Sequence, residues 1–237
     1  MLRWVCILLM VFPAPVQAQV SIYLTFDDGP GPGSRQVYAL ADSERVNINL
    51  FIVGYRATRP DSAADAFRMH RYDSFLLIAN HSFSHANSHY RAYYEDPAVV
   101  LSDFDRNKDT LKLPGNIARM PGRNFWRMDG RSEEDIVNGR EAADSLAAHG
   151  YRVIGWDIEW RSDTTGGHIS LSGAGMLERI DKLLRHNWTF TKGHVVILLH
   201  DQELEGKTFL EKVRELIRLG RADGRHRFEH LTTYPGA

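Results

Sequence analysis

Cysteine is nearly absent from the sequence, which excludes a fold held together by disulfide bonds. The single cysteine, Cys6, has no partner within the chain. An excess of charge is also absent, because 29 Lys and Arg residues balance 30 Asp and Glu residues to a net charge of −1 at pH 7. Without a basic excess there is no electrostatic reason to expect a nucleic-acid partner. Linkers and internal repeats are missing too, so one domain accounts for the chain.

Long apolar runs are missing, and the run near the beginning of the chain is short. It covers residues 4–12, and small residues and prolines follow at 13–18. A run of this length is too short to cross a bilayer as a stable helix. The pattern is typical of a secretory signal peptide, 1–18, and predicts a mature domain of residues 19–237 with no stable membrane insertion. We expect export to the periplasm or the extracellular space; the alternative is an anchor that stays uncut.

Short apolar runs rich in β-branched and aromatic residues alternate with helical patterns in the rest of the chain. The strand candidates are residues 21–26, 47–53, 75–79, 116–120, 151–158, 194–199 and 227–232. One-sided apolar stripes predict helices around 176–184 and 209–217. A capping box at 132–135 and a terminal Gly150 predict another helix between them. Repeated strand–helix units indicate a parallel sheet, closed or open, with the active site at the C-terminal strand ends.

Carboxylates and histidines directly follow several of these strands. Asp27 and Asp28 follow the first strand, where neighbouring side chains diverge, so that one can bind a metal while the other faces a substrate. His81 and His85 follow the third strand, and their spacing places both imidazoles on one face of a helix or a tight turn. His200 follows the apolar sixth strand, which suits a partly desolvated acid–base group.

Histidine pairs four residues apart occur three times in the chain, so their position has to choose among them. The pairs are His81/His85, His85/His89 and His226/His230. Only His81 directly follows an apolar strand, which favours the first pair. His89 remains a reserve ligand, and His226 and His230 are interpreted as surface and final-strand histidines.

Five segments, taken in chain order, resemble the five motifs of the polysaccharide deacetylase family, carbohydrate esterase family 4. They are TFDDGP at 25–30, HSFSH at 81–85, RMP at 119–121, WDIEW at 156–160 and LLH at 198–200. The first two motifs in combination are specific for the family, whereas the last three match it only by their order and spacing. Residues 49–54 also resemble the second strand of that family. The resemblance implies a distorted (β/α)7 barrel of the polysaccharide deacetylase type with one divalent metal.

The resemblance also implies roles for the strand-end residues. Asp28, His81 and His85 would bind the metal, commonly zinc, with cobalt, nickel or manganese as alternatives. Asp27 would be the general base and His200 the general acid. One carboxylate and two imidazoles leave coordination positions open, which is typical of a catalytic rather than a structural metal site.

Further residues would support this chemistry. Arg119 would, by resemblance, pair with Asp27 and keep it ionised; the alternative is a surface salt bridge of little energetic consequence. The backbone N–H of Gly122, directly after Pro121, would help to bind the oxyanion. Leu198 would line the pocket for the acetyl methyl group.

Two motifs depart from the family pattern. An aromatic residue usually follows the proline of the third motif, where this chain has Gly122, so Phe125 or Trp126 is the expected replacement as a substrate wall. Trp160 of the fourth motif is the other indole expected at the substrate site.

The fourth motif usually ends in Asp-Trp, and its Asp supports the acid histidine. This chain offers Asp157, Glu159 and Asp163 within a short stretch. Asp157 and Glu159 occupy alternate positions of one strand, so we expect either of them to be the partner of His200. The segment would be explained equally well if its aromatic residues packed in the core and its acidic residues were exposed to solvent, without a catalytic role.

The sequence thus predicts a metal-dependent hydrolase that removes N-acetyl groups from a glycan, either peptidoglycan or a chitin-type oligosaccharide. An O-acetyl esterase of the xylan type would use the same constellation. A further alternative is a secreted glycan-binding module without catalytic activity. A non-haem iron oxygenase also uses two histidines and one carboxylate, but such enzymes are typically built on antiparallel jelly rolls.

Overall fold

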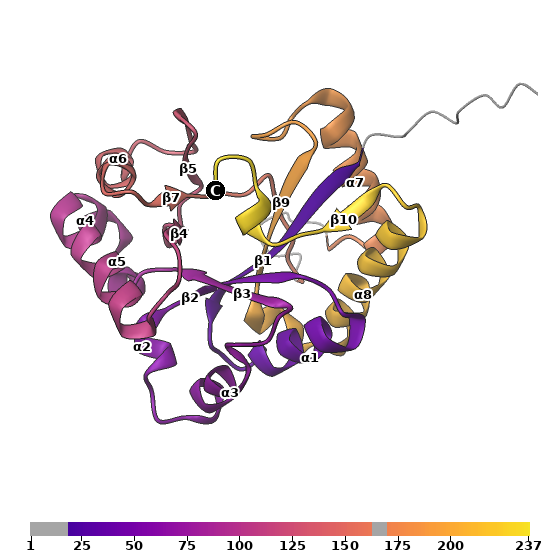
Figure 1. Cartoon of the computed structure of the whole chain (residues 1–237), viewed down its shortest axis with the longest axis horizontal. Coiled ribbons are helices and arrows are strands. Elements are labelled where there is room, and N and C mark those ends of the chain that lie inside the picture. Colours follow the sequence, from indigo (N-terminus) through magenta and orange to yellow (C-terminus); the bar gives the residue numbers. More distant parts are fainter. Residues whose placement is uncertain (1–18, 163–169) are drawn as a thin grey trace, which may run out of the picture.

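The computed structural model describes residues 19–162 and 170–237, so the predicted signal peptide lies outside the described residues (Figure 1). The strands are β1 Val20–Gly29, β2 Ile48–Ile52, β3 Leu76–Asn80, β4 Ile117–Ala118, β5 Phe125–Met128, β6 Arg131–Glu134, β7 Arg152–Val153, β8 Ile158–Glu159, β9 His194–His200 and β10 His226–Phe228. The helices are α1 Ser34–Glu44, α2 Gly54–Ala57, α3 Ser62–His70, α4 Tyr90–Tyr94, α5 Pro97–Leu111, α6 Arg140–Ala148, α7 Gly173–His186 and α8 Lys207–Ala222. Among these residues, no helix is both long enough and apolar enough to cross a bilayer.

All the strands belong to one sheet. Neighbours follow the order β6-β5-β7-β4-β3-β2-β1-β9-β8, and β10 also pairs with β1. Every pairing is parallel except those that β5 makes with β6 and β7. The path ends at β6 and β8, which do not pair with each other in the described part of the chain, so the sheet curls into an incomplete barrel (Figure 1). The predicted α/β class with a parallel sheet is confirmed.

The central strand β1 separates two apolar layers because its side chains alternate between the faces of the sheet. Ile22 and Phe26 point outward into the core that the sheet shares with α1, α7 and α8. Tyr23 points inward and packs in the barrel interior. The same alternation carries Thr25 and Asp27 to the inner face, where both contact Arg119. A buried strand therefore delivers a carboxylate to the rim of the barrel.

The neighbouring strand β9 follows the same rule. Val195, Ile197 and Leu199 pack in the outer core, whereas Val196 lies in the barrel interior. Leu198 and His200 then continue on the inner face. Because β1 and β9 are parallel and in register, Asp27 lies directly opposite His200. The pairing of the two strands thus fixes the two residues side by side.

Asp28 leaves this alternation through a local irregularity of the backbone. The register between β1 and β2 shifts between Phe26 and Gly29, and Asp28 has a φ of 73°. A bulge of this kind re-aims a side chain that would otherwise point to the opposite face. Both adjacent carboxylates consequently reach the same rim.

The helices α7 and α8 confirm the two predicted helical stripes, but the predicted helix start at 132–135 is wrong. Residues 132–134 of that segment belong to β6, which pairs with β5, and α6 begins only at Arg140. The hairpin turns at Asp129 and Gly130, whose φ values are 50° and 69°. Positive φ at both central residues is the geometry of a two-residue hairpin turn, for which Asp-Gly is a favoured sequence. Gly150 does follow the end of α6, with a φ of 84°.

The predicted strand 151–158 is divided into two strands. Its first part, β7, pairs with β4, and its last part, β8, pairs with β9. Gly155 lies between them, and a Cβ atom at this position would be 2.1 Å from Asn124 Oδ1 and 2.5 Å from Trp126 Nε1. The chain therefore passes from β7, beside β4, to β8 at the other end of the strand order instead of continuing as one strand.

The interpretation of His226 as a surface residue is also wrong. It lies on β10 and is only 4% exposed. Its Nδ1 lies 2.9 Å from Asp223 Oδ1, and its Nε2 lies 3.1 Å from Asp181 Oδ1. Because Asp181 belongs to α7, the imidazole connects that helix to the final strand and has a structural role.

Candidate active site

A small pocket opens where the C-terminal ends of β1, β3 and β9 meet. Its volume is about 210 Å³. It is lined by Asp27, Asp28, His81, His85, Tyr90, Gly122, Trp156, Glu159, Leu198 and His200. The expectation that polar residues after different strands would meet at one rim is therefore met for Asp27, Asp28, His81, His85 and His200.

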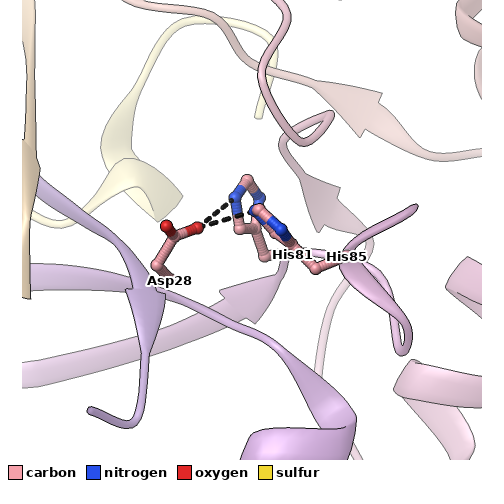
Figure 2. A group of neighbouring side chains, drawn as sticks. All are labelled: Asp28, His81 and His85. Atoms are coloured by element: carbon pink, nitrogen blue, oxygen red, sulfur yellow. Dashed lines mark ion pairs between the residues drawn. The ribbon is translucent and has the colours of Figure 1, made fainter. Parts of the chain in front are cut away.

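Asp28, His81 and His85 form a compact group of possible metal ligands (Figure 2). Asp28 Oδ1 lies 3.3 Å from His81 Nε2 and 2.8 Å from His85 Nε2. One potential ligand atom from each residue lies within 4.8 Å of the others, and no other such group occurs in the described ranges. Figure 2 shows the carboxylate facing both imidazoles. His89, the reserve ligand, is exposed outside this group.

The chemistry of this donor set fits a cation. His81 Nδ1 lies 2.9 Å from the carbonyl oxygen of Arg119, to which it donates its hydrogen. In a neutral imidazole the lone pair of Nε2 then faces the Asp28 carboxylate, which is repulsive unless a cation lies between them. Without a cation the two histidines would have to be protonated; burial opposes ionisation of Asp28, but their hydrogen bonds and positive charge then lower its pKa well below the usual range. The residues present therefore fit a divalent metal.

The turn that carries the histidines is not an α-helix. His85 begins a short 3-10 segment, His85–Ser88, and both Ser82 and His85 have positive φ, 61° and 53°. Ser82 Oγ accepts a hydrogen bond from His85 N at 3.0 Å, and Asn80 Oδ1 accepts one from Ser82 N at 3.0 Å. Of the two backbone forms that the spacing allowed, the tight turn is the one present.

Arg119 is fully buried beside Asp27, so the alternative of a surface salt bridge is wrong. Its Nη1 donates to Asp27 Oδ1 at 2.8 Å and to Thr25 Oγ1 at 2.7 Å. Its remaining donors reach the carbonyl oxygens of Ile154 and Gly155 at 3.1 and 2.7 Å. A carboxylate whose Oδ1 is held in this way keeps Oδ2 directed toward the pocket, where it lies 3.7 Å from His81 Nε2.

The structure separates the two carboxylates proposed as partners of His200. Asp157 accepts hydrogen bonds from the backbone N–H groups of Val196 and Phe190, at 2.7 and 2.8 Å. Burial raises its pKa to about 6, although these donors act in the opposite direction. The prediction that Asp157 supports His200 is therefore wrong, because its carboxylate holds the start of β9.

Glu159 does line the pocket together with His200. Its Oε1 pairs with Arg161 Nη1 at 3.4 Å. Within the described ranges, no hydrogen bond joins the His200 ring to a carboxylate. Asp163, the remaining candidate, lies outside the described residues.

Part of the chain matches a known protein family. A family model for polysaccharide deacetylase matches residues 16–125, which include the carboxylate pair, both histidines and Arg119. This part of the chain is thus similar in sequence to the polysaccharide deacetylase family. A chitin disaccharide deacetylase from Vibrio alginolyticus is 26% identical, with 65% of this chain and 50% of that protein covered. The chain thus spans about half the length of this curated relative.

Solved structures confirm the predicted fold of the polysaccharide deacetylase type. A Streptococcus mutans CE4 esterase matches with a TM-score of 0.65 and 22% identity, covering 88% of this chain and 85% of that one. The catalytic domain of a peptidoglycan N-acetylglucosamine deacetylase from Eubacterium rectale matches with a TM-score of 0.60 and 20% identity, covering 94% and 96%. This parallel α/β fold does not support the oxygenase alternative.

The prediction that Phe125, Trp126 or Trp160 forms an aromatic wall of the substrate site is wrong. Trp126 is 2% exposed and stacks on Phe190, with ring centroids 4.3 Å apart. Trp160 is 1% exposed and packs against Phe209. Phe125 is buried in a third cluster, beneath α6. These side chains build the core, so none of them replaces the aromatic residue absent at position 122.

Two aromatic residues that were not assigned to the site line the pocket instead, Tyr90 and Trp156. Trp156 lies in the fourth-motif segment, 156–160. Because the predicted strand is divided, Trp156 faces the pocket, whereas Trp160 faces the core. Tyr90 begins α4, so a search of strand ends does not find it. Gly122 lines the pocket with a φ of 61°, and the carbonyl oxygen of Pro121 accepts a hydrogen bond from Tyr94 at 2.6 Å.

Proposed function

We propose that this protein is a metal-dependent hydrolase of the polysaccharide deacetylase family that removes N-acetyl groups from an N-acetylated glycan outside the cytoplasmic membrane. The observation that supports this most strongly is the meeting of a metal-ligand group, a carboxylate and a histidine in one pocket: Asp28, His81, His85, Asp27 and His200. The proposed location rests on the pattern of residues 1–18.

The metal would be held by Asp28, His81 and His85. When bound there, a divalent cation polarises the acetyl carbonyl and makes water more acidic. Asp27 is placed to accept the proton of the attacking water at Oδ2, because Arg119 holds Oδ1.

His200 completes the proton transfers. A new C–O bond forms while the amide C–N bond breaks, and the departing nitrogen needs a proton to leave as an amine. His200 lies beside Asp27 in the register of β1 and β9 and lines the same pocket, so it is placed to supply this proton. The backbone N–H of Gly122, on the pocket wall, would donate to the oxygen that becomes negative. Leu198 would contact the acetyl methyl group.

Hydrolysis of a sugar O-acetyl ester would use the same two proton-transfer groups, so the preference for the amide rests on the named relatives. The named relatives include a chitin disaccharide deacetylase and a peptidoglycan N-acetylglucosamine deacetylase, and N-acetylglucosamine is common to both polymers. A bacterial esterase of the same fold keeps O-acetyl hydrolysis as the second candidate.

Acetate release tests this function. Zinc-loaded protein lacking residues 1–18 is incubated with peptidoglycan, chitin oligomers and acetylxylan, and acetate is measured. We expect acetate from one or both N-acetylated glycans. Release from acetylxylan alone would identify an O-acetyl esterase. No release from any of the three with metal bound would favour a silent glycan-binding module.

A further inference from the structure

We infer that Tyr90 is the specificity-determining wall between the acetyl pocket and an adjoining groove that receives the next sugar of the chain. This inference rests on the proposed function for the identity of the ligand. Its geometry depends on residues around α4, on the loop that follows β4 and on His85.

Tyr90 fills the space beside Gly122. A Cβ atom at Gly122 would lie 3.3 Å from Tyr90 Cε1 and 3.4 Å from Cζ. These distances are closer than ordinary van der Waals contacts, and Gly122 has a φ of 61°, which other residues rarely adopt. The glycine therefore leaves room for a ring that comes from a different element, and the pocket keeps an aromatic wall without a side chain at position 122.

Several contacts hold the ring in place. The Tyr90 hydroxyl lies 3.4 Å from His85 Nδ1, and the two rings are nearly perpendicular, with centroids 5.7 Å apart. On the other side, the Arg123 guanidinium carbon lies 5.9 Å from the centroid of the Tyr90 ring. Arg123 is itself fixed, because Nη2 donates to Asn138 Oδ1 at 2.9 Å. A wall supported from both sides is pre-organised for a ligand.

Tyr90 also belongs to a second, shallower hollow. This groove has a volume of about 730 Å³ and is lined by Ser88, His89, Tyr90, Arg91, Ala92, Glu95 and Arg123. The catalytic pocket, about 210 Å³, and the groove therefore share this one side chain. Because Tyr90 lines both the pocket and the groove, a sugar linked to the one being deacetylated would lie in the groove.

The chemistry of the wall suits a pyranose. An aromatic face offers apolar contact to the C–H face of a sugar ring, and the serine, histidine, arginine and glutamate side chains around it offer hydrogen bonds. The occupant is thus a neighbouring N-acetylated sugar of the same glycan.

Chain-length dependence measures this role. For Tyr90→Ala we expect KM for an N-acetylglucosamine tetramer to rise roughly fivefold to tenfold, with a smaller change for the single sugar. Tyr90→Phe keeps the ring and should retain the preference of the parent for the tetramer. The matched control is Tyr72→Ala, because Tyr72 is 85% exposed and does not line either hollow.

A binding measurement separates this inference from the proposed hydrolysis. Metal-free parent and variants are titrated with N-acetylglucosamine and with its tetramer by calorimetry, after thermal unfolding has shown that they are folded. We expect the parent to bind the tetramer more tightly and Tyr90→Ala to lose that difference. An unchanged difference in Tyr90→Ala, or none in the parent, would overturn the inference. Tighter tetramer binding that depends on Tyr90, without acetate release, would support it while the hydrolysis proposal fails.

Discussion

Asp27→Asn is expected to lower kcat by about 100-fold to 10,000-fold while the metal stays bound. The amide keeps the shape of the side chain, and its oxygen can still accept the hydrogen bond from Arg119, but it cannot take a proton from water. The loss should therefore appear in kcat rather than in KM. Steady-state kinetics on an N-acetylated oligosaccharide, together with metal analysis of the same sample, measures both quantities.

The charge of Arg119 makes a control necessary for this variant. Arg119 is 0% exposed, and removal of its carboxylate partner leaves a buried charge uncompensated, which lowers the free energy of unfolding. The kinetics must be measured well below the melting temperature. Asp42→Asn, on the exposed side of α1, is the matched control and should leave kcat unchanged. A kcat within a few-fold of the parent in Asp27→Asn would mean that another group accepts the proton.

His200→Ala is expected to damage amide hydrolysis far more than ester hydrolysis. The departing amine needs a proton, whereas the leaving group of an activated aryl acetate does not. We expect a loss of about 100-fold or more in kcat/KM for the amide and a loss of only a few-fold for the ester. Both rates are measured on one preparation, with His149→Ala, an exposed histidine on the end of α6, as the control.

Equal losses on the two substrates, with the metal still bound, would remove His200 from the role of general acid. It would then be assigned to positioning the substrate or to binding the oxyanion. The comparison of two substrates separates these roles because only one of the two reactions requires the proton.

Strand periodicity predicted the part of the site that lies on regular strands. Asp27 and His200 end parallel strands that pair in register, so their proximity follows from the pattern of apolar residues. The alternation alone would have sent Asp28 to the opposite face. A register shift and a positive φ, neither of which is visible in the sequence, bring it to the same rim.

The errors arise where tertiary packing decides which side a residue faces. Trp126 and Trp160 are large apolar residues near the motifs, and the core and the pocket both use such residues. Asp157 is buried by its contacts with backbone N–H groups of a segment more than thirty residues away in the chain. Asp129-Gly130 is a favoured hairpin sequence, and the β5–β6 hairpin that it forms takes up the residues that the capping-box pattern assigned to a helix.

The central claim is that Asp28, His81 and His85 hold a divalent metal, and metal content per chain tests it most directly. Parent, His85→Ala and His89→Ala proteins are loaded with zinc, freed of excess metal, and analysed by elemental mass spectrometry. We expect about one ion per chain in the parent and in His89→Ala, and almost none in His85→Ala. Metal retained in His85→Ala but lost in His89→Ala would contradict the claim.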